Sequence, residues 1–259
     1  MSSAPQISFD TYAPKVAIVT GGAQGIGYAI TRRLTDDGFD VAVNDIPAKQ
    51  KELDIVVEEV RQKGRRAIAV PGDVSSEPDV VVLVESTVRD LGSVDIMVAN
   101  AGVFFISEFL ELPVERFNDV FDVNVRGVFL CLKHAALQMV KQRRGGRLIA
   151  ASSAAGKQGL GNVSAYSASK FAVRGLIQSA SIDLRKYGIT ANAYAPGIIH
   201  TPMANEVIED EAAGKATVSV RQIAKPEVIA GLVSYLAKPE SYFVNGQTIT
   251  IDGGSYHFD

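Results

Sequence analysis

The sequence predicts a single α/β domain built on a doubly wound sheet of about seven parallel strands, with helices on both faces. Three observations predict this class. The 259 residues suit one such domain, and a hydrophobic content of 47% is ample for its core. Short β-branched runs alternate regularly with amphipathic helical stretches. The runs are mostly apolar on both faces, as strands of a covered parallel sheet must be.

Seven segments have the composition of strands, and the stretches between them predict the helices. The predicted strands are 15–20, 39–45, 66–71, 94–99, 146–152, 189–195 and 247–251. Right-handed crossovers between such strands leave ligands to bind beyond the carboxyl ends of the strands. We therefore expect the functional motifs to gather at that edge of the sheet.

The two segments without a clear pattern have separate interpretations. Residues 1–13 are polar and unpatterned, which predicts a flexible N-terminal arm before a single domain over 14–259. The stretch 200–225 also lacks a period, and we expect it to form a lid over the substrate.

Charge and composition exclude several function classes. The net charge is -3 and no Lys/Arg-rich block occurs, so the sequence predicts neither a nucleic-acid nor a membrane partner. The opening residues have no basic n-region or apolar h-region, so we expect no secretory leader. No window approaches the roughly 18 apolar residues that a membrane helix needs. The lone Cys131 stands in an apolar helical run, which predicts a buried, inert thiol. We expect a cytoplasmic protein that acts on a small molecule.

A glycine-rich turn follows the first predicted strand and opens the first helix. Gly21 allows a tight turn, Gly25 lets the backbone approach a pyrophosphate, and Gly27 lets the helix pack on the strand. The helix N-terminus would present free N–H groups to the anion. The segment predicts a Rossmann-type dinucleotide site. Its expected contacts are Gly21, Gln24, Gly25, Ile26 and Gly27.

An acidic residue, Asp45, ends the second predicted strand. Its carboxylate could accept hydrogen bonds from the hydroxyls of an adenosine ribose, and it would repel a 2'-phosphate. Gln24 is neutral, and Ile46 and Pro47 bring no basic residue after Asp45. The pattern therefore predicts NAD(H) rather than NADP(H). A helix-capping role for Asp45 is compatible with this interpretation.

Polar residues also follow the third and fourth predicted strands. We expect both groups to line the adenine side of the cofactor, although the same residues could simply close turns. The residues concerned are Asp73, Val74, Asn100, Ala101 and Gly102.

Tyr166 and Lys170 lie four residues apart and share one face of a predicted helix. A free tyrosine ionises near pH ~10, so it handles protons poorly at neutral pH unless a cation stabilises its phenolate. Lys170 could supply that cation. Taken alone, the spacing also fits an ordinary surface pair.

Together these motifs resemble the short-chain dehydrogenase/reductase family over roughly residues 14–254. The glycine-rich turn, Asn100-Ala-Gly102, Ser153, Tyr166-x-x-x-Lys170, Pro196-Gly197 and Asp252-Gly-Gly254 stand in the family's order. One departure is Ala99, where the family usually has Asn; we expect no effect on catalysis.

The resemblance implies a catalytic tetrad of Asn124, Ser153, Tyr166 and Lys170. Ser153, thirteen residues before Tyr166, would hydrogen-bond the substrate oxygen, and it is preferred to Ser152. Tyr166 would exchange a proton with that oxygen. Lys170 would lower the proton affinity of Tyr166 and hold the nicotinamide ribose, while Asn124 would fix a water.

The resemblance also implies the remaining contacts. The segment after the sixth strand would pass over the nicotinamide through Pro196, Gly197, Ile199 and Thr201. The substrate would meet Ser153, Ala155, Leu160, Tyr166 and Tyr194. Small apolar residues there favour an uncharged alcohol or ketone. His134 and His257 show no metal-ligand spacing, so no metal site is predicted.

Within the family, the chain looks most like acetoin (diacetyl) reductases and 2,3-butanediol dehydrogenases, although the segment from Ala204 to Lys225 looks shorter. A bulkier cyclic or terpenoid alcohol is an alternative substrate. Further alternatives are a 3-oxoacyl carrier-protein reductase, which Asp45 and the acidic stretch 206–211 oppose, and a non-catalytic NAD(H) sensor. Apolar surface on 114–139 and 164–187 predicts packing against symmetry mates, and the resemblance implies a homotetramer or dimer.

Overall fold

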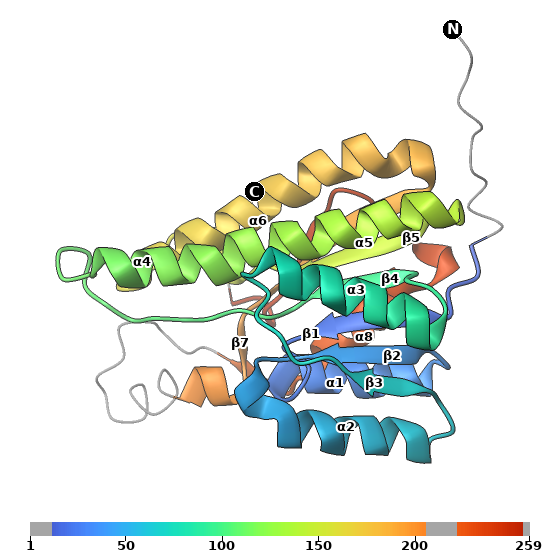
Figure 1. Ribbon diagram of the computed structural model, residues 1–259. Helices are drawn as coiled ribbons and strands as arrows, with labels where there is room; N and C mark the ends of the chain where they lie inside the picture. Colours follow the sequence, from blue (N-terminus) through green and yellow to red (C-terminus); the bar gives the residue numbers. More distant parts are fainter. Residues whose placement is uncertain (1–11, 206–221, 256–259) are drawn as a thin grey trace, which may run out of the picture.

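The computed structural model describes residues 12–205 and 222–255, and these residues contain one seven-stranded parallel sheet (Figure 1). Its strands are β1 (Val16–Thr20), β2 (Asp40–Asn44), β3 (Ala67–Ala69), β4 (Ile96–Ala99), β5 (Gly146–Ala151), β6 (Ile189–Pro196) and β9 (Thr248–Ile251). The order is β3-β2-β1-β4-β5-β6-β9, so the direction of winding reverses between β1 and β4. The predicted fold class is confirmed, and the reversal places a ligand crevice at the carboxyl ends of these two strands.

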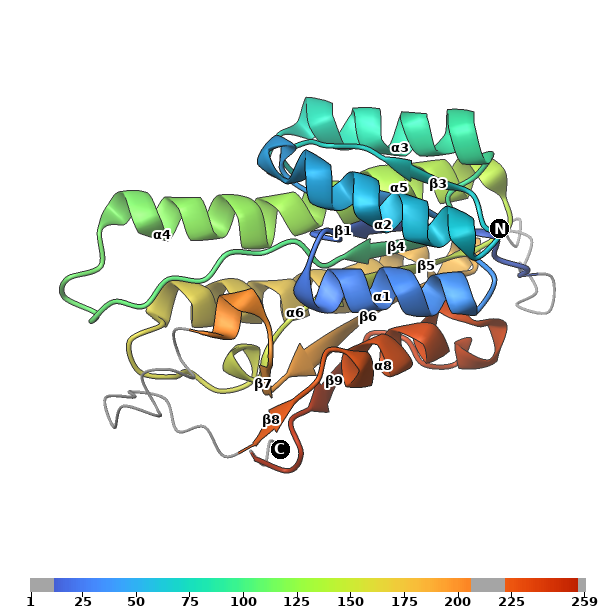
Figure 2. The same cartoon turned by 90° about the horizontal axis from the view of Figure 1, so that it is seen from below.

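Helices cover both faces of the sheet, as Figures 1 and 2 show. One layer contains α3 (Glu77–Leu91), α4 (Val114–Phe121), α5 (Val128–Gln142) and α6 (Ser164–Leu184). The other contains α1 (Gly25–Asp36), α2 (Gln50–Gln62) and α8 (Glu227–Ala237). Each layer encloses its own core against the sheet, with Met97 and Leu148 on one side and Val98 and Ile149 on the other. The alternation along β4 and β5 explains why these strands are apolar on both faces.

The thiol of Cys131 is part of the core between α5 and the sheet. It is 1% exposed, and burial raises its pKa to about 12. A thiol that stays protonated is a poor nucleophile. The expectation of a buried, inert cysteine is confirmed.

A second, smaller sheet was not predicted. Strand β7 (Ile198–Ile199) pairs in parallel with β8 (Ile223–Ala224). Two-residue strands carry no periodicity, so sequence alone could not reveal them. Strand β7 directly precedes the segment 200–225 that is expected to form a lid, and β8 lies near the end of that segment. Of this segment, 206–221 lie outside the described residues.

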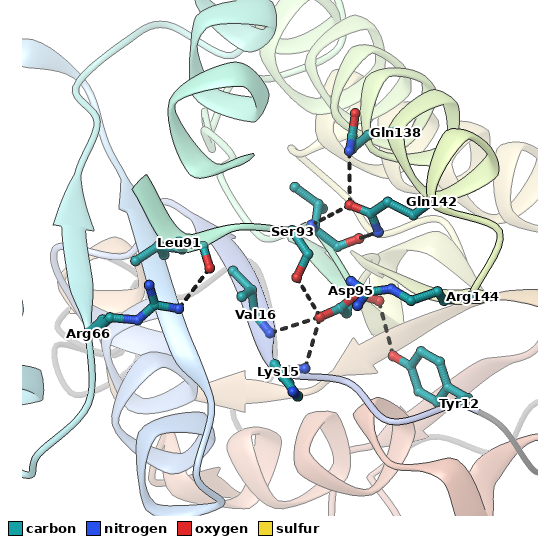
Figure 3. Close-up of polar contacts among 11 residues, drawn as sticks. Tyr12, Lys15, Val16, Arg66, Leu91, Ser93, Asp95, Gln138, Gln142 and Arg144 are labelled. Atoms are coloured by element: carbon teal, nitrogen blue, oxygen red, sulfur yellow. Dashed lines mark hydrogen bonds and ion pairs between the residues drawn. The ribbon is translucent and has the colours of Figure 1, made fainter. Parts of the chain in front are cut away.

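The predicted N-terminal arm is corrected at its end. Residues 1–11 lie outside the described residues, but Tyr12 is only 5% exposed. Its hydroxyl donates to the Asp95 carbonyl oxygen at 3.0 Å (Figure 3). The Arg147 guanidinium lies 3.9 Å from its ring centroid. One aromatic residue inside a polar stretch thus anchors the chain to the amino ends of the strands.

Within residues 12–205 and 222–255, no helix combines the length and apolar character needed to cross a membrane.

Candidate active site

A pocket of about 420 Å³ lies at the carboxyl ends of the central strands. It brings together nearly all of the residues that the sequence singled out. Gly27 and Asn124 are the two that do not line it. Both lie directly behind the lining, and their contacts give them supporting roles.

The glycine-rich turn has the backbone geometry expected of a phosphate cradle. Gly21 and Gly25 adopt positive φ angles of 62° and 57°, which side chains disfavour. A Cβ on Gly27 would overlap the carbonyl oxygen of Gly21. Gln24, the N-cap of α1, makes no side-chain cap, and the first turn has no acidic residue. Gly22 N and Ala23 N donate to Asn44 O and Asp45 Oδ2, so the N–H groups that this turn leaves for an anion are those of the uncapped first turn of α1.

The Asn100 side chain stabilises this turn through hydrogen bonds. Its Nδ2 donates to the carbonyl oxygens of Thr20 (2.9 Å) and Gly21 (3.2 Å), and its Oδ1 accepts from the Tyr194 hydroxyl at 2.7 Å. The backbone N–H of Asn100 donates to Thr20 Oγ1 at 3.0 Å. Asn100 lines the pocket, but its side chain primarily joins β1, β4 and β6. The analysis of the sequence missed Thr20, whose position as the last residue of the first strand was the available signal.

The Asp45 carboxylate is held in the pocket by backbone donors. Its Oδ2 accepts from Ala23 N at 3.1 Å and its Oδ1 from Ile46 N at 2.9 Å. The short 3-10 turn after it and α2 have Ile46 and Lys49 as their N-caps, without side-chain cap bonds. Asp45 is therefore not a helix cap. Lys49, which the sequence analysis did not select, also lines the pocket and is ion-paired with Glu52 at 3.0 Å.

Asp73 has the turn-closing geometry that was the alternative to cofactor contact. Its Oδ1 accepts from the backbone N–H and the hydroxyl of Ser75, both at 2.8 Å. It still lines the pocket together with Val74. Turn closure and contact with a ligand are thus compatible at this position.

Ser153, Tyr166 and Lys170 meet in the pocket at the junction of β5 and α6. The Ser153 hydroxyl hydrogen-bonds the Tyr166 phenol. The Lys170 ammonium lies 5.5 Å from the centroid of the Tyr166 ring and donates to the Ala151 carbonyl oxygen at 2.9 Å. The neighbouring Ser152 instead donates its hydroxyl to the Lys170 carbonyl oxygen at 3.1 Å. Geometry thus supports Ser153, not Ser152, as the serine that faces a reacting group.

Burial shifts the ionisation of this group in opposite directions. It raises the pKa of Tyr166 above its ordinary value, and the hydrogen bond with Ser153 offsets part of that rise. It lowers the pKa of Lys170 to about 8. The causes of the Tyr166 shift are burial and the hydrogen bond with Ser153, and the Lys170 ammonium donates to a backbone carbonyl oxygen. The expectation that Lys170 lowers the proton affinity of Tyr166 stays a prediction.

Asn124 occupies a π-helical turn, Asp122–Gly127, between α4 and α5. Its Oδ1 accepts from Val103 N at 2.8 Å, and its Nδ2 donates to Val103 O at 2.9 Å. Nδ2 also lies 3.1 Å from the Ser169 hydroxyl oxygen. A Cβ on Gly102 would come within 3.1 Å of Asn124 Oδ1. Asn124 is fully buried and fixes the loop after β4, a role that sequence analysis did not foresee.

The substrate side of the pocket is apolar. Ala155 and Leu160 line it as expected, and Tyr194 lies beneath it with its hydroxyl on Asn100. Phe104, which the sequence analysis missed, packs edge-on against Tyr166 with ring centroids 4.9 Å apart and an interplanar angle of 84°. Further lining residues that it missed are Val103, Val163 and Ala204. Ala154, expected near the pocket, also lines it, as do Ile198, Pro202 and Met203 from the segment expected to pass over the nicotinamide.

Three known relatives resemble the chain along nearly its full length. A short-chain dehydrogenase/reductase, eriH, from Hericium erinaceus is 52% identical, with 93% of this chain and 98% of the relative covered. A diacetyl reductase [(S)-acetoin forming] from Staphylococcus aureus is 40% identical, covering 93% and 97%. An L-2,3-butanediol dehydrogenase from Corynebacterium glutamicum is 37% identical, covering 93% and 98%.

Solved structures agree with this relationship. A short-chain type dehydrogenase/reductase from Mycobacterium marinum superposes with a TM-score of 0.87 at 32% identity, covering 95% of this chain and 96% of that one. The acetoin dehydrogenase YohF from Salmonella typhimurium gives 0.83 at 33% identity, covering 93% and 97%.

The sheet order, the glycine-rich turn and the serine-tyrosine-lysine group define an oxidoreductase of the nicotinamide-dinucleotide class. A sequence model described as short chain dehydrogenase matches residues 15–212, and the chain belongs to the short-chain dehydrogenase/reductase family. The resemblance inferred from the sequence is confirmed, and the protein is an enzyme.

Proposed function

We propose that this enzyme interconverts a secondary alcohol and a ketone with NAD(H). The observation that carries the proposal is that Ser153, Tyr166 and Lys170 share one pocket with the glycine-rich turn and Asp45. A proton-handling group and a dinucleotide cradle in one cavity are what hydride transfer requires.

The residues present fit a nicotinamide dinucleotide. The turn at Gly21 and Gly25 and the uncapped start of α1 would hold the pyrophosphate, and Asp45 would accept from the adenosine ribose. A Cβ on Gly25 would come within 3.3 Å of the Thr201 side chain, so this cradle tolerates little extra bulk. When bound, the nicotinamide supplies or accepts a hydride at C4.

The polypeptide handles the proton. In ketone reduction, the Ser153 hydroxyl donates a hydrogen bond to the carbonyl oxygen, and Tyr166 donates the proton. The raised pKa of Tyr166 keeps its phenol protonated at neutral pH, which favours reduction. In the reverse direction the same phenolate must accept the alcohol proton, so oxidation is favoured at alkaline pH.

The Lys170 ammonium has a position that supports both steps. It is 3% exposed and lies beside the Tyr166 ring, where its charge is weakly screened. It would stabilise negative charge on the phenolate and hold the hydroxyls of the nicotinamide ribose.

Asp45 supports the preference for NAD(H). A 2'-phosphate would lie against a carboxylate whose orientation two backbone N–H groups fix. The nearby cation, Lys49, is engaged with Glu52, so it offsets this repulsion only in part.

Two substrate classes have separate support. The names of the relatives favour a small hydroxyketone or diketone. The apolar pocket wall favours a bulkier alcohol. Asp45 opposes a 3-oxoacyl carrier-protein reductase, which would prefer NADPH, and the intact serine-tyrosine-lysine group opposes a sensor without turnover.

The test is the consumption of NADH and NADPH by the purified chain over a panel of ketones that includes diacetyl and cyclohexanone. We expect turnover with a higher kcat/KM for NADH. Equal or better use of NADPH would contradict the role of Asp45. Binding of NADH without turnover of any ketone would support the sensor.

We also propose that the enzyme is a cytoplasmic homo-oligomer, a tetramer or a dimer. Support for assembly comes from large apolar side chains that are exposed on the layer of α4, α5 and α6. They are Val114 (68%), Phe129 (45%), Leu137 (58%), Phe171 (41%) and Ile182 (66%). Light scattering of the full chain would test the assembly, and a monomer at micromolar concentration would contradict it.

A further inference from the structure

The loop after β4 is fixed at two points. At one end, the side chain of Asn124 binds both the N–H and the carbonyl oxygen of Val103. At the other end, Ser107 N donates to the carbonyl oxygen of Asn162 at 2.8 Å. Asn162 adopts a φ of 59°, so the partner loop is also held in an unusual conformation. The segment 103–107 is thus clamped between the π-helical turn and the loop 157–163.

This clamp holds Phe104 against the reacting group. The Phe104 ring meets the Tyr166 ring edge-on at 4.9 Å. Leu160 and Val163, from the loop to which Ser107 is bonded, line the same pocket. Met203 lines it from the 3-10 turn Pro202–Ala204. The substrate end therefore has an aromatic wall on one loop and aliphatic walls on two other segments.

These walls of the pocket are apolar. Every side chain that the segments 103–107, 154–163 and 202–204 contribute to the described pocket lining is apolar. The polar groups nearest the reacting centre are Ser153 and Tyr166, and both are needed for a single substrate oxygen. Ser152 donates its hydroxyl to the Lys170 carbonyl. A second oxygen on the substrate would find no polar side-chain partner on these described walls.

We propose that the substrate is a secondary alcohol or ketone with one oxygen at the reacting centre and a ring-sized apolar substituent, and that Phe104 determines this specificity. The inference rests on the proposed function and deepens it. In oxidation, the alcohol loses a hydride to NAD⁺ and its hydroxyl proton to Tyr166. The products are the ketone, NADH and one proton.

The first test compares four alcohols in the oxidation direction with NAD⁺. They are 2,3-butanediol, 2-butanol, cyclohexanol and decahydro-2-naphthol. The first two share a carbon skeleton and differ by one hydroxyl, and the last two enlarge the apolar group. Oxidation is preferred to reduction because a vicinal diketone is intrinsically more reactive than a simple ketone.

We expect kcat/KM for 2-butanol to equal or exceed that for 2,3-butanediol. We expect at least a tenfold rise from 2-butanol to decahydro-2-naphthol, since one methylene in an apolar pocket is worth about tenfold or more. A kcat/KM for 2,3-butanediol that is at least tenfold above the other three would overturn the inference and leave the proposed function intact. No oxidation of any alcohol would overturn the proposed function itself, and the inference with it.

The second test isolates the aromatic wall. Phe104→Ala should lower kcat/KM for decahydro-2-naphthol at least tenfold and that for 2-butanol much less. The matched control is Phe105→Ala, which removes the same ring from the next residue. Phe105 lies outside the pocket lining, with the Arg116 guanidinium 5.5 Å from its ring centroid.

Binding of NADH, followed by fluorescence titration, should be unchanged in both variants, which would show that the fold and the cradle are intact. An equal loss for all alcohols in both variants would make Phe104 a loop-folding residue and overturn its role in specificity. Retention of the preference in Phe104→Leu, which keeps most of the apolar volume, would support the role.

Discussion

Charged groups are buried at both the amino and the carboxyl ends of the central strands, but the two groups differ in how completely they are hydrogen-bonded. At the amino edge, the Asp95 carboxylate is 4% exposed and has a partner for each oxygen (Figure 3). Its Oδ2 accepts from Lys15 N, Val16 N and Ser93 Oγ at 2.9–3.1 Å, and its Oδ1 accepts from Arg144 Nη2 at 2.8 Å. Both carboxylate oxygens thus accept from donors of the protein itself, and we call these residues the closed cluster.

At the carboxyl ends of the strands, the buried Lys170 ammonium makes one hydrogen bond to the described residues, to the Ala151 carbonyl oxygen, although it can donate three. The Tyr166 phenol is bonded to Ser153 and faces the cavity. Burial alone therefore does not mark a functional site. The site is marked by buried polar groups that lie beside a cavity and have hydrogen-bond donors without a protein partner.

Removal of the Tyr166 hydroxyl is the strongest test of this difference between the two ends of the strands. Tyr166→Phe should lower kcat by about 10²–10⁴-fold, because a positioned proton donor contributes that much. The melting temperature should change little. Tyr187→Phe, at the far end of α6 and outside the pocket lining, is the matched control. A kcat for Tyr166→Phe within threefold of wild type would refute the role of the phenol.

The amino edge should respond in stability instead of activity. Asp95→Ala leaves two backbone N–H groups and Arg144 without their acceptor, so the free energy of unfolding should fall by about 3 kcal/mol. Urea denaturation measures this change. Asp90→Ala, which removes an exposed carboxylate paired only with its neighbour Arg89, should cost less than about 0.5 kcal/mol. Equal effects from the two substitutions would mean that the closed cluster is unimportant.

The preference for NADH over NADPH tests the role of Asp45 at the predicted adenosine end of the pocket. Asp45→Ala should narrow the preference for NADH over NADPH by about tenfold, because the 2'-phosphate no longer meets a carboxylate. The ratio of kcat/KM values for the two cofactors measures it. Asp54→Ala, an exposed site on α2, is the control. An unchanged ratio would remove Asp45 from cofactor selection.

The pH dependence of ketone reduction tests the ionisation of Lys170. Burial lowers its pKa to about 8, so the ammonium is present below that pH and is lost above it. We expect the rate to fall to about half near pH 8 and to fall further with each unit. The residual activity of Lys170→Met should lack this limb. A wild-type rate that is flat from pH 7 to pH 10 would contradict the assignment.

The same shift has a defined sign for stability. The unfolded chain binds a proton at Lys170 up to about pH 10.4, whereas the folded chain releases it near pH 8. The contribution of Lys170 to stability therefore rises between these two values.

The smallest effect is expected from Arg147, a buried cation at the amino ends of the strands. It has no exposed surface, and its Nε and Nη2 have no hydrogen-bond partner among the described residues. Its guanidinium packs on the Tyr12 ring, and its Nη1 donates to the Gly146 carbonyl oxygen at 3.0 Å. Because these contacts do little more than offset the loss of water, Arg147→Met should change the free energy of unfolding by less than about 1 kcal/mol. A loss above about 3 kcal/mol would contradict this expectation.

The elements that sequence predicted well are those with a strong local cause. The core strands are apolar on both faces, and the glycines at 21, 25 and 27 meet local steric needs. Gly27 was correctly predicted to allow close packing, since a Cβ there would overlap the backbone of the turn. These requirements for apolar or very small residues can be recognised from the residue types alone.

The supporting contacts could not be predicted, because each joins residues far apart in the chain. Asn124 clamps Val103, 21 residues away, and its expected contact with a water stays a prediction. Tyr12 was placed in a flexible arm, yet it bonds Asp95 across 83 residues. Phe104 carries no motif, and its contact with Tyr166 exists only because two loops are brought together.

By itself, the sequence determined the fold class and the family, and it selected Ser153, Tyr166 and Lys170 as candidates for the proton-handling group, because these depend on hydrophobic periodicity and on short motifs with local geometry. Only the tertiary structure decided the ionisation of Tyr166 and Lys170 and the shape of the substrate walls. Both depend on how much water packing removes and on which groups it leaves as partners. These are properties of the folded surroundings, and no residue encodes them alone.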